Sequence, residues 1–293
     1  MRSLRLGALL LVALASAWPA GACGAGEEED AGRVRVVTTL SIFADFARNV
    51  GGERVEVEAL LPPGADAHTY ELAPRQVAGI GRADVVFING LHLEEAVLGA
   101  VERNVSAEAP VVRLSEGLTP LDNNPHFWLD VTYAMRYVEV MRDTLSAVDP
   151  EGAEAYAANA ARYLGELEAL DGEVRAAVGR IPPERRKLVT FHDAFRYLAE
   201  RYGLEVVALV VKSPGREPSA SDVAELARQI AEQRIPTVFR EPQFSARILE
   251  LAARDAGVRV GELYSDALTG GVDTYIEMMR FNARQLEKGL GGA

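Results

Sequence analysis

Four histidines are the residues of this chain best suited to chemistry, and their positions suggest a metal site. They are His68, His92, His126 and His192. None forms a local motif such as His-Glu-x-x-His, so spacing along the chain is a weak signal. Each follows an apolar run typical of a buried strand, and Asp266 follows another. In an open parallel sheet such positions lie at the ligand-binding edge. The residues therefore predict a histidine-rich metal site at this edge and leave open which of them are ligands.

Several carboxylates could add to this chemistry. Glu241 directly follows an apolar run, where it could support a metal ligand or cap the next helix. Asp193, next to His192, is a second possible supporting carboxylate. Glu94 and Glu95 could form a carboxylate pair, but a solvated start of a helix is the favoured interpretation. The sequence contains no Gly-x-Ser-x-Gly, which argues against the usual serine hydrolase.

The elements that must position these residues alternate between apolar runs and helical patterns. Strands are expected at 34–38, 55–61, 84–88 and 110–114, and again at 188–191, 205–211, 237–239 and 258–261. Helices are expected at 41–50, from 74 onward, at 94–104 and 130–147, and then at 194–202, 221–233, 245–256 and 273–288. This alternation predicts doubly wound parallel sheets covered by helices on both faces, arranged as two α/β lobes with a cleft between them.

A long stretch without a predicted strand separates the two blocks. Residues 150–180 are rich in Ala, Glu, Leu and Arg, which are strong helix formers, and their larger apolar residues follow one stripe. A helix of 30 residues is about 45 Å long, so this one could be a rigid link between the lobes. The expected parts are an N-terminal lobe at 33–149, a linker helix at 150–181 and a C-terminal lobe at 182–293.

The first residues are typical of an export signal. Two arginines precede an apolar run at 6–18, and small residues at 20–22 form a cleavage site. Cys23, the only cysteine, follows at once, which favours a lipoprotein with a lipidated N-terminal cysteine. We expect a signal peptide at 1–22 and a flexible acidic tether at 23–32. The mature chain is then anchored at the outer face of the cytoplasmic membrane or is periplasmic.

Composition narrows the class of protein further. The chain has 293 residues, of which 48% are hydrophobic and 25% charged, as is ordinary for a folded soluble protein. A net charge of −12 argues against a nucleic-acid-binding surface. With a single cysteine, an intramolecular disulfide and a cysteine-rich zinc finger are excluded. We expect a monomer.

Five segments carry a resemblance to a known family. They are residues 63–71 (PGADAHTYE), 125–130 (PHFWLD), 191–195 (FHDAF), 241–244 (EPQF) and 266–268 (DAL). These segments resemble the ligand segments of the zinc/manganese substrate-binding lipoproteins of bacterial ABC importers. The resemblance covers nearly everything from Val34 to the C-terminus, in the same order.

The resemblance implies a fold and a ligand set. It implies two α/β lobes joined by one long helix, with a metal ion held between them by His68, His126, His192 and Asp266. It also implies that His92 is not a ligand, a point that the residues themselves leave open. Three imidazoles and one carboxylate suit four-coordinate zinc. In this family a carboxylate at the third position tends to accompany manganese, so His192 there favours zinc, with manganese or iron as the alternative.

We therefore expect a receptor that captures zinc and delivers it to an ABC importer permease, and not an enzyme. Two other classes stay open. A zinc hydrolase would use Glu241 or Asp193 as its base and would keep water at one ligand position. A surface adhesin with a structural metal would bind a host or matrix partner. Because imidazole ligands must be neutral, metal affinity is expected to fall as the pH drops through about 6.5.

Overall fold

The structure, a computed structural model, describes residues 32–211 and 219–292. The expected signal peptide at 1–22, Cys23 and nearly all of the expected tether lie outside the described residues. Within those residues, no helix combines the length and the apolar character that a membrane span requires.

The N-terminal block folds into a parallel sheet. Its strands are β1 Val34–Thr38, β2 Val55–Ala59, β3 Val85–Ile88 and β4 Val111–Arg113, in the spatial order β2-β1-β3-β4. Every residue of β3 is buried, as expected for a central strand that is covered on both faces. The run of apolar residues therefore forms the middle of the sheet.

The C-terminal block repeats this arrangement. Its strands are β5 Lys187–Thr190, β6 Glu205–Leu209, β7 Thr237–Arg240 and β8 Arg259–Glu262, in the order β6-β5-β7-β8. In each sheet the first strand lies between the second and the third. The loops that follow neighbouring strands in this order are where open parallel sheets bind their ligands.

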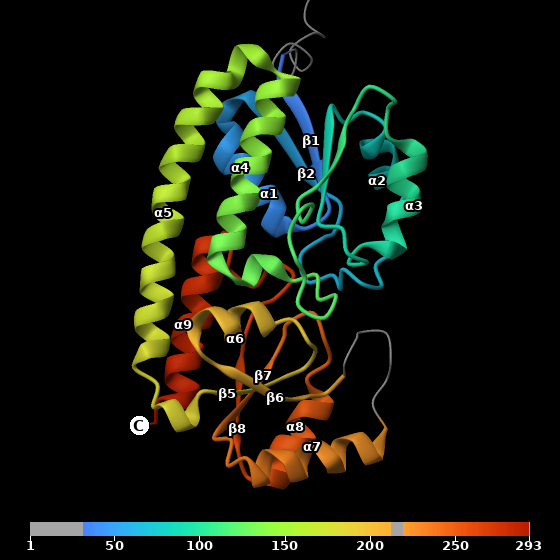
Figure 1. Cartoon of the computed structure of the whole chain (residues 1–293). Helices are drawn as coiled ribbons and strands as arrows, with labels where there is room; N and C mark the ends of the chain where they lie inside the picture. The colour runs from blue at the N-terminus through green and yellow to red at the C-terminus, as the bar shows by residue number, and fades with distance from the viewer. Residues whose placement is uncertain (1–31, 212–218, 293) are drawn as a thin grey trace, which may run out of the picture. The chain divides into compact units, whose positions relative to one another are not determined.

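Helices cover both faces of each sheet (Figure 1). They are α1 Ser41–Gly51, α2 Pro74–Ile80, α3 Glu95–Asn104, α4 Val131–Val148, α5 Ala153–Gly179, α6 Arg196–Tyr202, α7 Ala220–Glu232, α8 Arg247–Ala256 and α9 Tyr275–Leu290. In Figure 1, α2 and α3 lie on one face of the N-terminal sheet, and α1 and α4 lie on the other. The predicted two-lobe α/β fold is confirmed.

Helix α5 is the predicted long helix between the lobes. It has 27 residues, which corresponds to about 40 Å. Its buried residues, such as Tyr163 and Leu167, form the expected apolar stripe. This stripe packs against α1 and α4 of the first lobe and against α9 of the second, so α5 is held by both lobes along its length.

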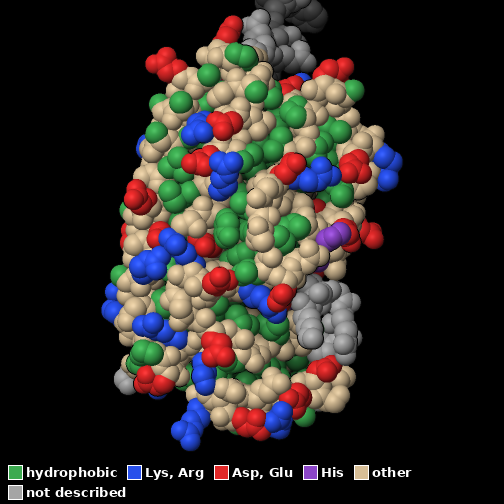
Figure 2. Space-filling model, viewed as in Figure 1, with side chains coloured by type: hydrophobic (Ala, Val, Ile, Leu, Met, Phe, Trp, Pro, Cys, Tyr) green, Lys and Arg blue, Asp and Glu red, His purple; other side chains and the backbone are tan. Residues whose placement is uncertain are grey.

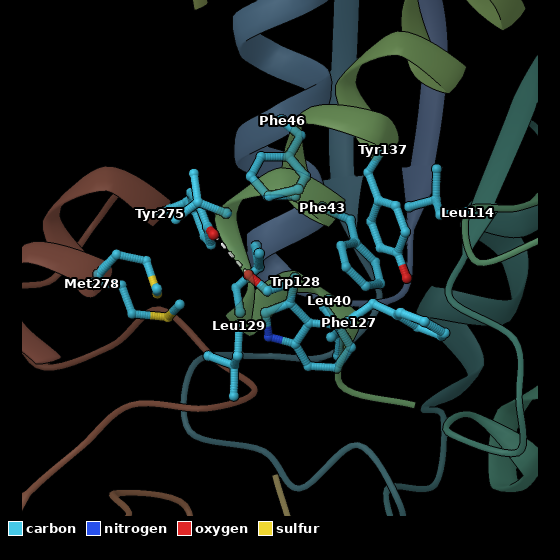
Figure 3. Packing of buried hydrophobic residues seen from close by; sticks show 14 of the residues in the cluster. Leu40, Phe43, Phe46, Leu114, Phe127, Trp128, Leu129, Tyr137, Tyr275 and Met278 are labelled. Atoms are coloured by element: carbon cyan, nitrogen blue, oxygen red, sulfur yellow. Dashed lines mark hydrogen bonds between the residues drawn. The ribbon is translucent and has the colours of Figure 1, made fainter. Parts of the chain in front are cut away.

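The larger hydrophobic core extends across both lobes, and a second, smaller one lies within the C-terminal lobe. Figure 3 shows its centre, where Trp128 and Tyr275 lie among aromatic and aliphatic side chains. The Tyr275 hydroxyl donates to the carbonyl of Trp128 over 2.7 Å, and Trp128 Nε1 donates to the carbonyl of Ser265 over 2.7 Å. Because these bonds and rings join segments of different lobes, they oppose a wide hinge motion.

The surface carries charges of both signs. On the face shown in Figure 2, acidic and basic side chains are interspersed, and hydrophobic side chains occur in small groups between them. Several charges of the described residues form ion pairs on the surface, such as Arg280 with Glu173 and Arg180 with Glu287. Both of these pairs connect α5 or its end to α9, but exposed pairs add little stability.

Candidate metal centre

Four side chains from loops that follow strands converge on one point. His68 lies in the loop after β2, and His126 precedes the 3₁₀ turn Phe127–Leu129 that leads into α4. His192 follows β5, and Asp266 follows β8. One possible ligand atom of each lies within 4.8 Å of those of the other three. Two of the side chains come from each lobe, so the cluster lies where the lobes meet.

The facing atoms are spaced as a shared cation requires. His126 Nε2 lies 3.2 Å from His192 Nε2 and 3.5 Å from Asp266 Oδ1. His192 Nε2 lies 3.6 Å from Asp266 Oδ2. The ring centre of His68 is 5.5 Å from that of His126. Four tetrahedral donors at about 2.0–2.1 Å from a zinc ion lie about 3.3 Å apart. The distances among His126, His192 and Asp266 are therefore close to those of donors that share a zinc ion, and all four possible ligand atoms lie within 4.8 Å of one another.

Three buried atoms of the cluster make no well-directed hydrogen bond among the described residues: His68 Nε2, His192 Nδ1 and Asp266 Oδ1. Of these, His192 Nδ1 has the carboxylate of Glu241 beside it. Buried polar atoms are normally hydrogen-bonded, and leaving one unpaired is costly. An imidazole nitrogen and a carboxylate oxygen that face the same point are instead suited to coordinate a cation.

Glu241 holds His192 from the side away from the cluster. His192 Nδ1 lies 2.8 Å from Glu241 Oε2, and the backbone N–H of His192 donates to Oε1 over 3.1 Å. Ser265 Oγ donates to the same carboxylate over 2.6 Å. A carboxylate at Nδ1 leaves Nε2 facing the other ligands and makes the imidazole a better electron donor.

Burial and charge set the protonation of the cluster. Burial by itself lowers the pKa of His192, but the carboxylates of Glu241 and Asp266 outweigh it and raise this pKa to about 9. Burial raises the pKa of Asp266 to about 7. Burial also lowers the pKa of His68 to about 4 and that of His126 well below its ordinary value. At neutral pH the proton that a metal ion must displace is therefore mainly on His192.

The family of zinc-uptake complex component A periplasmic proteins matches residues 36–289. The chain belongs to this family. The manganese-binding lipoprotein MntA of Halalkalibacterium halodurans is 36% identical, over 92% of this chain and 94% of that protein. The iron-binding protein YfeA of Yersinia pestis is 34% identical, over 90% of this chain and 88% of that protein. The structure of the periplasmic zinc-binding protein TroA from Treponema pallidum matches with a TM-score of 0.82 and 31% identity, covering 89% of this chain and 100% of that one.

In this member of the zinc-uptake family, His92 lies apart from the cluster. Its side chain is 68% exposed, and its Nδ1 pairs with Glu95. The loop after β3 turns through Gly90, Leu91 and His92, which all have positive φ angles. This turn leaves the imidazole at the surface, and the structure thereby separates His92 from the three histidines that converge.

One expectation for an acidic residue needs correction, and another stays a prediction. Glu94 is not solvated: it is 3% exposed, and its carboxylate accepts hydrogen bonds from the backbone N–H groups of Asn89 and Gly90. Burial raises its pKa. The carboxylate of Asp193 binds the guanidinium of Arg196, the first residue of α6, over 2.8 Å, and a supporting role for Asp193 stays a prediction.

Two residues that contact the clustered side chains were not singled out by the sequence. Gln243 Nε2 donates to Asp266 Oδ2 over 3.1 Å. Asn124 Oδ1 lies 2.9 Å from His126 Nδ1. Each lies two positions from a residue that the sequence did single out, Glu241 or His126, and Gln243 lies within the EPQF segment that carries the resemblance. Neither signal shows which polar side chain reaches the cluster, because that depends on the folding of the loop.

Proposed function

We propose that this chain is an extracytoplasmic receptor that captures a divalent metal ion and delivers it to the permease of an ABC importer. The observation that carries the proposal is the cluster of His68, His126, His192 and Asp266, whose possible ligand atoms lie within 4.8 Å of one another. Membership of the zinc-uptake family supports it. So do the names of relatives that are metal ABC transporter substrate-binding lipoproteins.

Zinc is the proposed cargo, and manganese or iron is the alternative. Relatives named for zinc, manganese and iron are all similar to this chain. Three imidazoles and one carboxylate favour zinc, because zinc accepts nitrogen ligands in four-coordinate sites. Manganese prefers carboxylate, carbonyl and water oxygens, and this cluster offers a single carboxylate.

The proposed mechanism is capture by closure of a four-donor site. Four protein donors complete a tetrahedral zinc site and leave no position for a reactive water, which favours carriage over hydrolysis. Two donors come from each lobe, so binding the metal fastens the lobes together. Because α5 packs against both lobes, we expect small lobe movements and loop rearrangement on release.

The remaining parts of the proposal concern the ends and partners of the chain. Cys23 is the proposed lipid attachment site after removal of the signal peptide at 1–22, with a tether at 23–32. The two lobes at 33–149 and 182–293, with the linker helix at 150–181, then act as a monomer at the outer face of the cytoplasmic membrane. The importer permease is the partner.

The test is elemental analysis of the mature chain. Residues 24–293 are stripped of metal, dialysed against equimolar zinc and manganese, and analysed. We expect one retained zinc ion per chain, which is lost in His192→Ala. The matched control is His92→Ala, which removes an exposed histidine and should leave retention unchanged.

The other outcomes decide between the alternatives. Retained manganese would support the proposed receptor function and identify manganese, not zinc, as the cargo. Retention of no metal by the wild type would overturn the four-ligand site and favour a surface adhesin. Turnover of a test ester or phosphate by the zinc-loaded protein would favour the hydrolase.

A further inference from the structure

Asn124 is a buried residue whose polar atoms all have partners. It lies just before Pro125 and His126, and 6% of it is exposed. Its backbone N–H donates to the backbone carbonyl of Leu121 over 2.8 Å, and its own backbone carbonyl accepts from the hydroxyl of Tyr197 over 2.7 Å. Its side-chain oxygen and nitrogen both bind backbone groups, and these two contacts determine the orientation of the Asn124 amide.

The backbone partners fix which way the Asn124 amide points. Oδ1 accepts from the backbone N–H of His126 over 3.0 Å, and a backbone N–H can only donate. Nδ2 donates to the backbone carbonyl of Asp193, which can only accept. The group that faces His126 Nδ1 at 2.9 Å is therefore an acceptor, so Nδ1 carries the hydrogen and Nε2 is left with its lone pair toward the cluster.

The same amide crosses between the lobes. Asp193 follows His192 directly, so the bond from Asn124 Nδ2 joins the segment that holds His126 to the segment that holds His192. Tyr197 of α6 reaches the same segment through its hydroxyl. Two hydrogen bonds from the C-terminal lobe thus hold the residue that orients a ligand of the N-terminal lobe.

We propose that Asn124 is a positioning residue with two linked roles: it selects the His126 tautomer whose Nε2 faces the metal, and it fastens the two ligand segments together, so that metal release requires its bond to Asp193 to break. The proposal rests on the proposed metal site and goes beyond it. Asparagine is required because the two roles need an acceptor and a donor on one short side chain.

Substitutions at this position separate the two roles. Asn124→Asp keeps an acceptor for His126 but places a second oxygen against the carbonyl of Asp193, which removes the fastening bond and adds repulsion. Asn124→Ala removes both contacts. Asn123→Asp is the matched control, because it makes the same chemical change at the neighbouring exposed residue.

The first measurement is the tautomer of His126 in the metal-free protein, read from its imidazole ¹⁵N chemical shifts at pH 7.5. We expect the hydrogen on Nδ1 in the wild type, in Asn124→Asp and in Asn123→Asp, and a loss of this preference in Asn124→Ala. A wild type with the hydrogen on Nε2, or an alanine variant with unchanged shifts, would overturn the tautomer role. No metal is needed, so this result stands even if the proposed cargo is wrong.

The second measurement is the rate of zinc dissociation into an excess of chelator, followed by stopped flow. Loss of the buried hydrogen bonds of the Asn124 side chain should speed dissociation by about tenfold in Asn124→Ala, which places no carboxylate beside His126, and Asn123→Asp should leave the rate unchanged. Equal rates in wild type and Asn124→Ala would overturn the fastening role. Failure of the wild type to bind zinc would instead count against the proposed function.

A second variant tests the fastening role without changing Asn124 itself. Tyr197→Phe keeps the ring and removes the hydroxyl that binds the Asn124 carbonyl. It should leave the His126 tautomer unchanged and speed zinc dissociation by a smaller factor. An unchanged dissociation rate in a folded Tyr197→Phe would also contradict the fastening role.

Discussion

Lowering the pH from 8 to 7 should weaken zinc binding by about 17-fold, because protons compete with the metal for its ligands. The structure determines which protons matter. The pKa of His192 is raised to about 9 and that of Asp266 to about 7, whereas that of His68 is lowered to about 4. Each ligand binds metal only in its deprotonated form, so affinity falls as the pH drops below the pKa of that ligand in the metal-free protein.

The magnitude follows from these values. The share of proton-free His192 falls about ninefold between pH 8 and pH 7, and that of Asp266 falls about twofold. The product of these two factors, about 17, corresponds to about 1.7 kcal/mol of binding free energy. Three imidazoles with the ordinary value of about 6.5 would lose only about twofold over the same interval. The structure therefore predicts that affinity is already falling well above a pH of about 6.5, the value expected for free imidazoles.

The assay is competition with a chelator of known pH dependence, together with the protons released per zinc ion. About one proton should be released at pH 8 and about 1.5 at pH 7. Glu241→Gln is the informative variant, because the Glu241 charge raises the pKa of both His192 and Asp266. Its pH dependence should be weaker than that of the wild type. A twofold loss of affinity in the wild type, or an unchanged profile in the variant, would refute the reasoning.

Two further predictions concern the contacts that join the lobes. Asp45→Ala removes the carboxylate that accepts from the backbone N–H of Tyr275 and the hydroxyl of Tyr163; it should lower the free energy of unfolding by about 2–3 kcal/mol in urea denaturation of the metal-free protein. An unchanged unfolding midpoint would contradict this. Trp128→Phe keeps most of the ring packing but leaves the carbonyl of Ser265 without its indole donor. It should cost about 1–3 kcal/mol in the same experiment, and equal stability to wild type would show that the bond contributes nothing.

The sequence by itself determined the elements and their order. Apolar runs of four or five residues at 84–88 and 188–191 predicted buried strands, and the structure has β3 and β5 there. The stripe of residues 150–180 predicted the long helix that is α5. These predictions succeed because hydrophobic periodicity is a local property, set by the repeat of the strand or helix itself. The resemblance to the importer family then indicated which four of the candidate residues converge.

The tertiary structure alone decided which polar residues share an environment. His92 and His126 both follow strands, yet one is exposed and the other buried. Glu94 reads as a surface residue beside Glu95 but is buried on backbone amides. Asn124 looks like its exposed neighbour Asn123. These differences arise from contacts between segments distant in the chain, and so do the opposite pKa shifts of otherwise identical imidazoles, because burial and nearby charge depend on what the fold brings close.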